Sequence, residues 1–104
     1  MLTSGSATTV TSVDLSAAVP PIAKGLTAQM LGDTSIATGT SSSFLYSDSG
    51  GVMLIGFERF HSVTANNSQG TMVTNGVISV ASTVYYKVSA GTDDLAINVY
   101  GWGY

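Results

Sequence analysis

The 104-residue chain carries three basic and six acidic side chains, which gives a formal net charge of -3 at neutral pH. Nucleic-acid binding and adhesion to anionic membranes both need several cationic side chains, so this balance argues against both functions. The chain has no cysteine, which excludes disulfides, thiolate metal sites and catalysis by a cysteine nucleophile.

The composition predicts a single folded domain rather than a disordered or membrane-spanning chain. Only 9% of the residues are charged, whereas 44% are hydrophobic and spread along the chain. No apolar run reaches the roughly 18 residues that a transmembrane helix needs. We expect a flexible lead over residues 1–7, without the basic and apolar regions of a signal peptide, followed by one domain over residues 8–104.

The first half of the chain predicts short strands separated by turns. Residues 8–15 are rich in β-branched side chains and predict a first strand. Residues 22–31 fit either a helix or a strand, and Gly25, which costs about 1 kcal/mol in a helix interior, favours the strand. The further expected elements are a turn over 32–35, a short edge strand over 36–40 and a strand over 44–46.

Residues 52–60 follow the strongest turn signal, at residues 47–51, and are almost continuously apolar. Strict alternation places Leu54 on one face of this strand and Ile55 and Phe57 on the other. A strand that is apolar on both faces is normally covered on both, and a small domain covers only one. Another copy of the chain is the simplest partner for the second face. The predicted oligomer interface consists of Met53, Ile55, Phe57, Arg59 and His61.

The second half predicts further strands and the overall class. Residues 71–80 read as a strand, with Asn75–Gly76 as a type I′ turn or a bulge. Residues 83–88 and 95–100 read as a closing hairpin, in which Leu95, Ile97 and Val99 form a buried face. Strands at this spacing predict an all-β fold, an antiparallel β-sandwich or jelly roll of about eight strands.

The chain offers little to support catalysis or metal binding. His61 is the only histidine, and no G-x-S-x-G nucleophile elbow accompanies it. Asp93 and Asp94 lack the spacing of a calcium loop and read as turn residues. Glu58 and Asp14 are conceivable as a glycosidase pair, but this assignment is not favoured. We therefore predict a non-enzymatic protein without a metal or cofactor, in which Glu58 and its neighbours form either an inter-subunit polar cluster or a solvated strand end.

The last residues are the most unusual in composition. Tyr100, Trp102 and Tyr104 alternate with Gly101 and Gly103, which leaves the ring faces open. Tyrosine and tryptophan provide rigid, amphipathic contact area for sugars or for other proteins. The three aromatic residues are therefore predicted to contact either a ligand or a neighbouring subunit. Packing of Trp102 and Tyr104 at the end of the core is a further alternative, and the sequence leaves these interpretations open.

Two stretches resemble a known group of proteins. VDLSAAVP (residues 13–20), followed by AKGL (residues 23–26), resembles the opening of C-terminal or accessory β-sandwich domains of bacteriophage virion proteins. These include tail-fibre tips, tail-needle knobs and head decoration proteins. Residues 84–88 and 95–102 resemble their closing hairpin.

The resemblance implies a homotrimeric jelly roll of the tumour-necrosis-factor-like kind, without a catalytic motif. It implies a virion structural protein, made in the host cytoplasm, that attaches to a host-surface glycan or protein or stabilises the particle beside other virion proteins. The alternative prediction is a monomeric carbohydrate-binding module.

Overall fold

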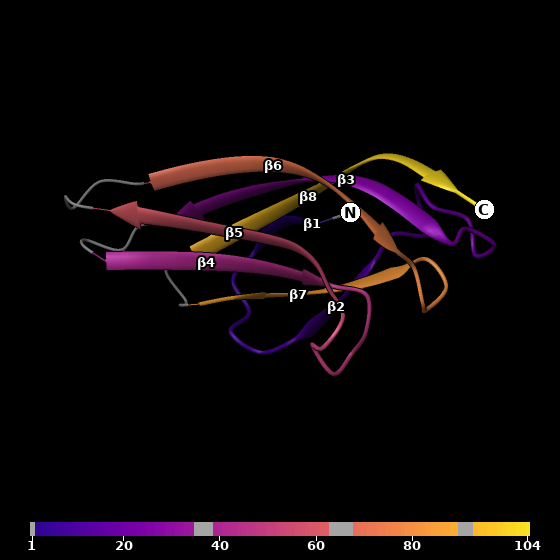
Figure 1. Cartoon of the computed structure of the whole chain (residues 1–104), viewed down its shortest axis with the longest axis horizontal. Coiled ribbons are helices and arrows are strands. Elements are labelled where there is room, and N and C mark those ends of the chain that lie inside the picture. The colour runs from indigo at the N-terminus through magenta and orange to yellow at the C-terminus, as the bar shows by residue number, and fades with distance from the viewer. Residues whose placement is uncertain (1, 35–38, 63–67, 90–92) are drawn as a thin grey trace.

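The computed structural model describes residues 2–34, 39–62, 68–89 and 93–104, and these residues form eight β-strands in two antiparallel sheets. The strands are β1 (Leu2–Gly5), β2 (Thr11–Asp14), β3 (Gly25–Thr34), β4 (Gly39–Tyr46), β5 (Leu54–Ser62), β6 (Ser68–Val77), β7 (Thr83–Val88) and β8 (Asp93–Gly103). Sheet A has the order β1-β8-β3-β6 and sheet B the order β2-β7-β4-β5. The sheets lie as two layers of an elongated molecule (Figure 1). The predicted all-β class, with two antiparallel sheets, is confirmed.

The strand pairs are nested along the chain. β4 pairs with β5, β3 with β6, β2 with β7 and β1 with β8, each time antiparallel. β8 also pairs with β3, and β7 with β4, which joins the nested pairs into two sheets. The predicted closing hairpin is therefore wrong, because β7 and β8 lie in different sheets. Alternation identifies a strand and its buried face, but it does not identify the partner strand.

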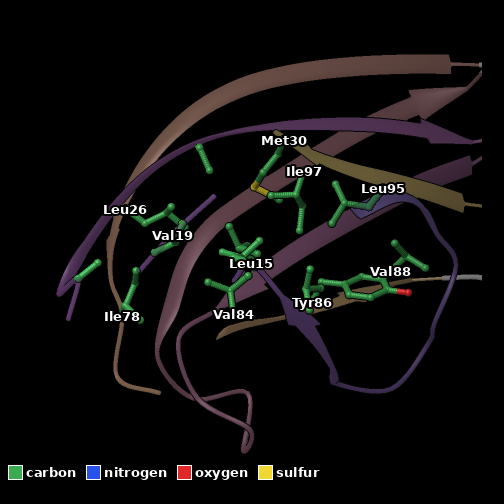
Figure 2. Packing of buried hydrophobic residues seen from close by; sticks show 14 residues of the cluster. Leu15, Val19, Leu26, Met30, Ile78, Val84, Tyr86, Val88, Leu95 and Ile97 are labelled. Atoms are coloured by element: carbon green, nitrogen blue, oxygen red, sulfur yellow. The ribbon is translucent and has the colours of Figure 1, made fainter. Parts of the chain in front are cut away.

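The hydrophobic core fills the space between the sheets. Figure 2 shows side chains from both layers meeting there, and the labelled ones are Leu15, Val19, Leu26, Met30, Ile78, Val84, Tyr86, Val88, Leu95 and Ile97. In β7 every second residue is buried, the pattern of a strand with one face on a core. Leu95 and Ile97 are fully buried and Val99 packs against the cluster, so the predicted buried face of β8 is confirmed.

Two glycines let the edge strands β5 and β6 approach closely and close one side of the sandwich. A Cβ atom on Gly76 would lie 2.7 Å from Cβ of Ile55, and one on Gly56 would lie 2.5 Å from the sulfur of Met30. The Thr74 hydroxyl donates a hydrogen bond to the backbone carbonyl of Ile55 across the same contact. Asn75 and Gly76 are paired within β6, opposite Thr27 and Leu26. The predicted type I′ turn at these two residues is therefore wrong.

A bulge changes the face assignment in β5. Leu54 lies opposite Tyr46, whereas Gly56 lies opposite Leu45, so Ile55 is an extra residue on this strand. Leu54 and Phe57 consequently share the outer side of sheet B, and Ile55 points toward β6. The predicted alternation, with Leu54 on one face and Ile55 with Phe57 on the other, is wrong because it assumed an unbroken period of two.

Two segments expected to be irregular are strands. Residues 2–5, predicted as part of a flexible lead, form β1, with Leu2 opposite Ile97 and Gly5 opposite Leu95. The turn predicted at residues 32–35 is also wrong, since β3 continues through Thr34. Pairing with a long neighbouring strand satisfies the backbone groups of both segments, which outweighs their local turn chemistry. The edge strand predicted over 36–40 lies partly outside the described residues, of which Gly39 and Thr40 begin β4.

The turn signal at residues 47–51 is confirmed in the connection between β4 and β5. The Asp48 carboxylate accepts hydrogen bonds from the backbone N–H groups of Val52, at 3.1 Å, and Met53, at 2.8 Å. Gly51 has a φ of 68°, in the left-handed region that favours glycine. A Cβ there would lie 3.8 Å from Cζ of Tyr46, so the connection folds over this ring.

We expect Gly76→Ala to destabilise the protein by about 1–3 kcal/mol, the usual cost of overpacking, because its methyl group would collide with Ile55. Gly101→Ala is the matched control, since a Cβ at Gly101 meets nothing within 4 Å. Urea unfolding of the two variants measures the difference. Equal stability of the two variants would contradict the close approach of β5 and β6.

Candidate functional site

The C-terminal aromatic residues lie at the end of β8, beside β3. Tyr100 is 60% exposed, Trp102 41% and Tyr104 85%, although two of them touch each other. The rings of Trp102 and Tyr104 meet edge to face, with centroids 5.5 Å apart. Such pairs orient their rings and contribute about 0.5–1.5 kcal/mol beyond the area they bury. The structure thus brings Trp102 and Tyr104 together on the surface.

Tyr100 is separated from this pair by a bulge. Ala28 lies opposite Val99, and the next residue of β3, Thr27, lies opposite Gly101. Tyr100 is therefore the extra residue of β8. It begins the aromatic segment in the sequence, but its ring is not part of the Trp102–Tyr104 pair. The bulge interrupts the alternation of aromatic and glycine residues that is apparent in the sequence.

An open hollow of about 400 Å³ lies beside Trp102 on β3, β6 and β8. Its lining residues are Gly25, Leu26, Thr27, Asn75, Gly76, Gly101, Trp102 and Gly103. The Thr27 hydroxyl lies 2.6 Å from Oδ1 of Asn75 and donates a hydrogen bond to it, which orients the amide. Cβ atoms on Gly101 and Gly103 would meet nothing within 4 Å, so the absence of side chains there keeps the hollow open.

The backbone around the hollow is held by hydrogen bonds that extend the pairing beyond the strands. The N–H of Lys24 donates to the carbonyl of Gly103 over 2.8 Å, and the N–H of Ile78 donates to the carbonyl of Lys24 over 2.8 Å. Trp102 itself lies opposite Leu26, a core residue. The backbone that carries the aromatic pair is thus held by hydrogen-bonded strands. Paired strands position binding side chains more rigidly than a loop does.

The residues predicted to form an oligomer interface do not share one face. Met53 is exposed in the connection before β5, whereas Ile55 is half-buried and packs against the core cluster. Phe57 and Arg59 point outward from sheet B and are exposed. His61 lies in β5 opposite Thr40, but its side chain is outside the described part. The bulge at Ile55 is the physical reason for the separation.

The outer side of sheet B carries a cluster that sequence reasoning missed. The Phe44 ring lies 5.1 Å from that of Phe57 and 6.1 Å from that of Tyr46, between ring centroids. The Lys87 ammonium lies 5.1 Å above Phe44, and the Arg59 guanidinium 5.8 Å above Phe57. The aromatic residues at alternate positions in 44–46 were the only available signal, and their neighbours come from strands whose pairing the sequence does not state.

Glu58 points into the sandwich rather than toward Arg59 or solvent. It is 7% exposed and lies opposite Ser43, which is fully buried. Burial raises the pKa of Glu58 to about 7, although a hydrogen bond from the Gly32 backbone opposes the shift. Asp14 lies exposed on β2, at the opposite edge of sheet B, so the two carboxylates do not form the conceivable glycosidase pair. Because Glu58 is buried, it is not a solvated strand end, and its carboxylate does not face outward for the alternative inter-subunit polar cluster.

The described residues contain no group of three histidine, cysteine or acidic side chains that would hold a metal ion. They also contain no helix long and apolar enough to cross a membrane. Comparison with known protein families and with curated proteins finds no match to the chain. The two candidate sites, the hollow beside Trp102 on sheet A and the aromatic cluster on sheet B, are therefore identified from their geometry alone.

The raised pKa of Glu58 predicts that the protein loses stability as the pH rises. The folded-state pKa of about 7 lies above the reference value of 4.5, so between these values the folded protein retains a proton that the unfolded chain has released. The free energy of unfolding should fall across this window and level off above it, by a total on the order of 3 kcal/mol. Thermal unfolding measured between pH 5 and pH 8 tests this.

Glu58→Gln is the control for this pH dependence. Glutamine is neutral at every pH and keeps an oxygen that can accept the hydrogen bond from Gly32. We expect a flatter stability profile for the variant and a higher melting temperature than wild type at pH 8. An unchanged slope between pH 5 and pH 7 would assign the effect to a group other than Glu58.

Proposed function

We propose that this protein is a non-enzymatic jelly-roll domain that binds carbohydrate on a host surface, as an attachment component of a bacteriophage virion. The strand orders β1-β8-β3-β6 and β2-β7-β4-β5 support the jelly roll, an architecture of eight strands in two sheets. Jelly rolls occur in viral capsid proteins and in lectins, so the architecture agrees with both parts of the proposal. This support rests on analogy of fold alone, so the evidence for carbohydrate binding must come from the geometry of the site.

The observation that carries the proposal is the exposed ring pair of Trp102 and Tyr104 beside an open hollow. Sugars present apolar C–H faces that pack on aromatic rings, together with hydroxyl groups that need hydrogen-bond partners. Thr27 and Asn75 in the lining of the hollow are hydrogen-bonding partners for sugar hydroxyl groups, and the glycines of the lining leave room for a ring-sized ligand. No charged side chain lines it, which favours a neutral saccharide over an acidic one at this site.

We expect Trp102→Ala to weaken binding of an oligosaccharide identified on a glycan array by tenfold or more. Loss of a central aromatic contact commonly costs about 2 kcal/mol or more of binding free energy, whereas truncating a partly exposed side chain should cost the fold less. Calorimetric titration measures the affinity, and thermal unfolding checks that the variant is folded.

Val73→Ala is the matched control, since Val73 is 54% exposed on β6 of the same sheet but does not line the hollow. It should leave the affinity unchanged. A glycan array without a single bound sugar would remove the carbohydrate proposal, and so would a Trp102→Ala variant that binds as tightly as wild type.

We also propose that the domain assembles as a homotrimer, which would suit attachment or stabilisation of a particle. The observation that favours assembly is a run of exposed apolar residues, with Val52 81%, Met53 49% and Leu54 50% exposed. Exposed apolar surface of this kind marks interaction sites more often than free surface.

Light scattering should give a mass of about three times the 10.6 kDa of the single chain. Met53→Asp should shift the protein to the monomer, because a carboxylate buried in an apolar contact is strongly unfavourable. Ile22→Asp is the control, since Ile22 is 57% exposed but lies in the connection before β3. A wild-type mass of 10.6 kDa would contradict the trimer and favour the monomeric carbohydrate-binding module.

A further inference from the structure

The outer side of sheet B, here named the cationic face, combines aromatic rings with two of the three basic residues of the chain. Phe44 lies opposite both Lys87 on β7 and Phe57 on β5. Arg59 follows on β5, two residues beyond Phe57. Because cross-strand neighbours project from the same side of a sheet, these four side chains form one continuous surface.

The two cations are fixed above the rings. The Lys87 ammonium lies 5.1 Å from the centroid of Phe44, and the Arg59 guanidinium lies 5.8 Å from that of Phe57. Each contact is worth about 0.5–1 kcal/mol at an exposed site, which restrains the charged group without neutralising it. The ring faces are then occupied, so this surface presents positive charge and is poorly suited to stacking of a neutral sugar.

The carboxylates that border the cationic face are engaged elsewhere. Asp48 accepts hydrogen bonds from the backbone N–H groups of Val52 and Met53 within its own connection. Asp14, at the end of β2, accepts a hydrogen bond of 2.8 Å from the N–H of Ser16, and this bond lowers its pKa. The positive charge of the face is thus available to a ligand.

Hydroxyl groups continue the surface along β7 and β2. Tyr85 lies opposite Tyr46 on one side and Ser12 on the other, and Thr83 is two residues away on the same side of β7. Ser12 is exposed, whereas Tyr85 and Thr83 are partly exposed. A hydroxyl both donates and accepts hydrogen bonds, which matches the hydroxyl groups of a saccharide. Two cations beside a row of hydroxyls therefore complement a ligand that is both anionic and hydroxyl-rich.

We propose that the cationic face binds an acidic polysaccharide, with its carboxylate or sulfate groups on Arg59 and Lys87 and its hydroxyl groups along Ser12, Thr83 and Tyr85. This site is distinct from the neutral hollow on sheet A and does not depend on it. Contact with the same face of a second copy is disfavoured, because it would bring like charges together. Two cations are also few for a nucleic acid, which spreads its charge over many phosphates.

The test uses the full chain with three probes: a sulfated oligosaccharide, polygalacturonate as a carboxylated polymer, and neutral dextran. Calorimetric titration at low salt should detect binding of at least one acidic probe and none of dextran. Arg59→Gln and Lys87→Gln should each weaken this binding about fivefold, and the double variant roughly 25-fold, as expected for exposed charge pairs. Raising the salt concentration should weaken it further.

Lys24→Gln is the matched control, because it makes the same change of charge at the one remaining basic residue, which is exposed beside β3. It should leave the affinity for the acidic probe unchanged, and so should Trp102→Ala, which tests the other site. Wild type that binds neither acidic probe would overturn the proposal. Equal weakening by Lys24→Gln, or loss of binding of the acidic probe in Trp102→Ala, would also overturn it. A change of oligomeric mass in the Arg59 or Lys87 variants would do so too, because the face would then be a contact between copies.

Discussion

The contact between Ile55 and Gly76 is the constraint on which the arrangement of the two surfaces depends. It closes the sandwich where β5 and β6 meet, and it requires glycine at a position where a Cβ would lie 2.7 Å from Ile55. The bulge that turns Ile55 toward β6 also resets the alternation of β5. As a result Phe57 and Arg59 point outward, and Glu58 points into the sandwich, where burial raises its pKa to about 7.

The nested pairing of strands distributes the chain's chemistry over two unlike surfaces. Sheet A ends in the hollow beside Trp102, whose lining is uncharged and rich in glycine. Sheet B carries Lys87 and Arg59 above the rings of Phe44 and Phe57. With only three basic residues in the chain, the gathering of two on one face follows from strand pairing and not from clustering in the sequence. The two proposed sites would therefore select different classes of saccharide.

Several elements could be predicted from the residues because their signals are local. β7 and β8 follow the period of two, and the turn at Asp48 to Gly51 uses side-chain hydrogen bonding and a left-handed glycine. The aromatic segment stands out because glycine on either side of Trp102 leaves its ring uncovered. The alternation predicted for β5 was wrong for the opposite reason: one extra residue in a strand leaves no mark in the sequence, yet it changes which side chains share a face.

The sequence by itself determined the all-β class and the buried face of β8, because both depend on residue type and short-range spacing. Only the tertiary structure decided that β7 and β8 belong to different sheets, that Asn75 and Gly76 lie inside a strand, and that Lys87 meets Phe44. These outcomes depend on pairings between residues that are far apart in the chain. Such pairings are selected by the packing of the whole core, so no single segment carries the information that specifies them.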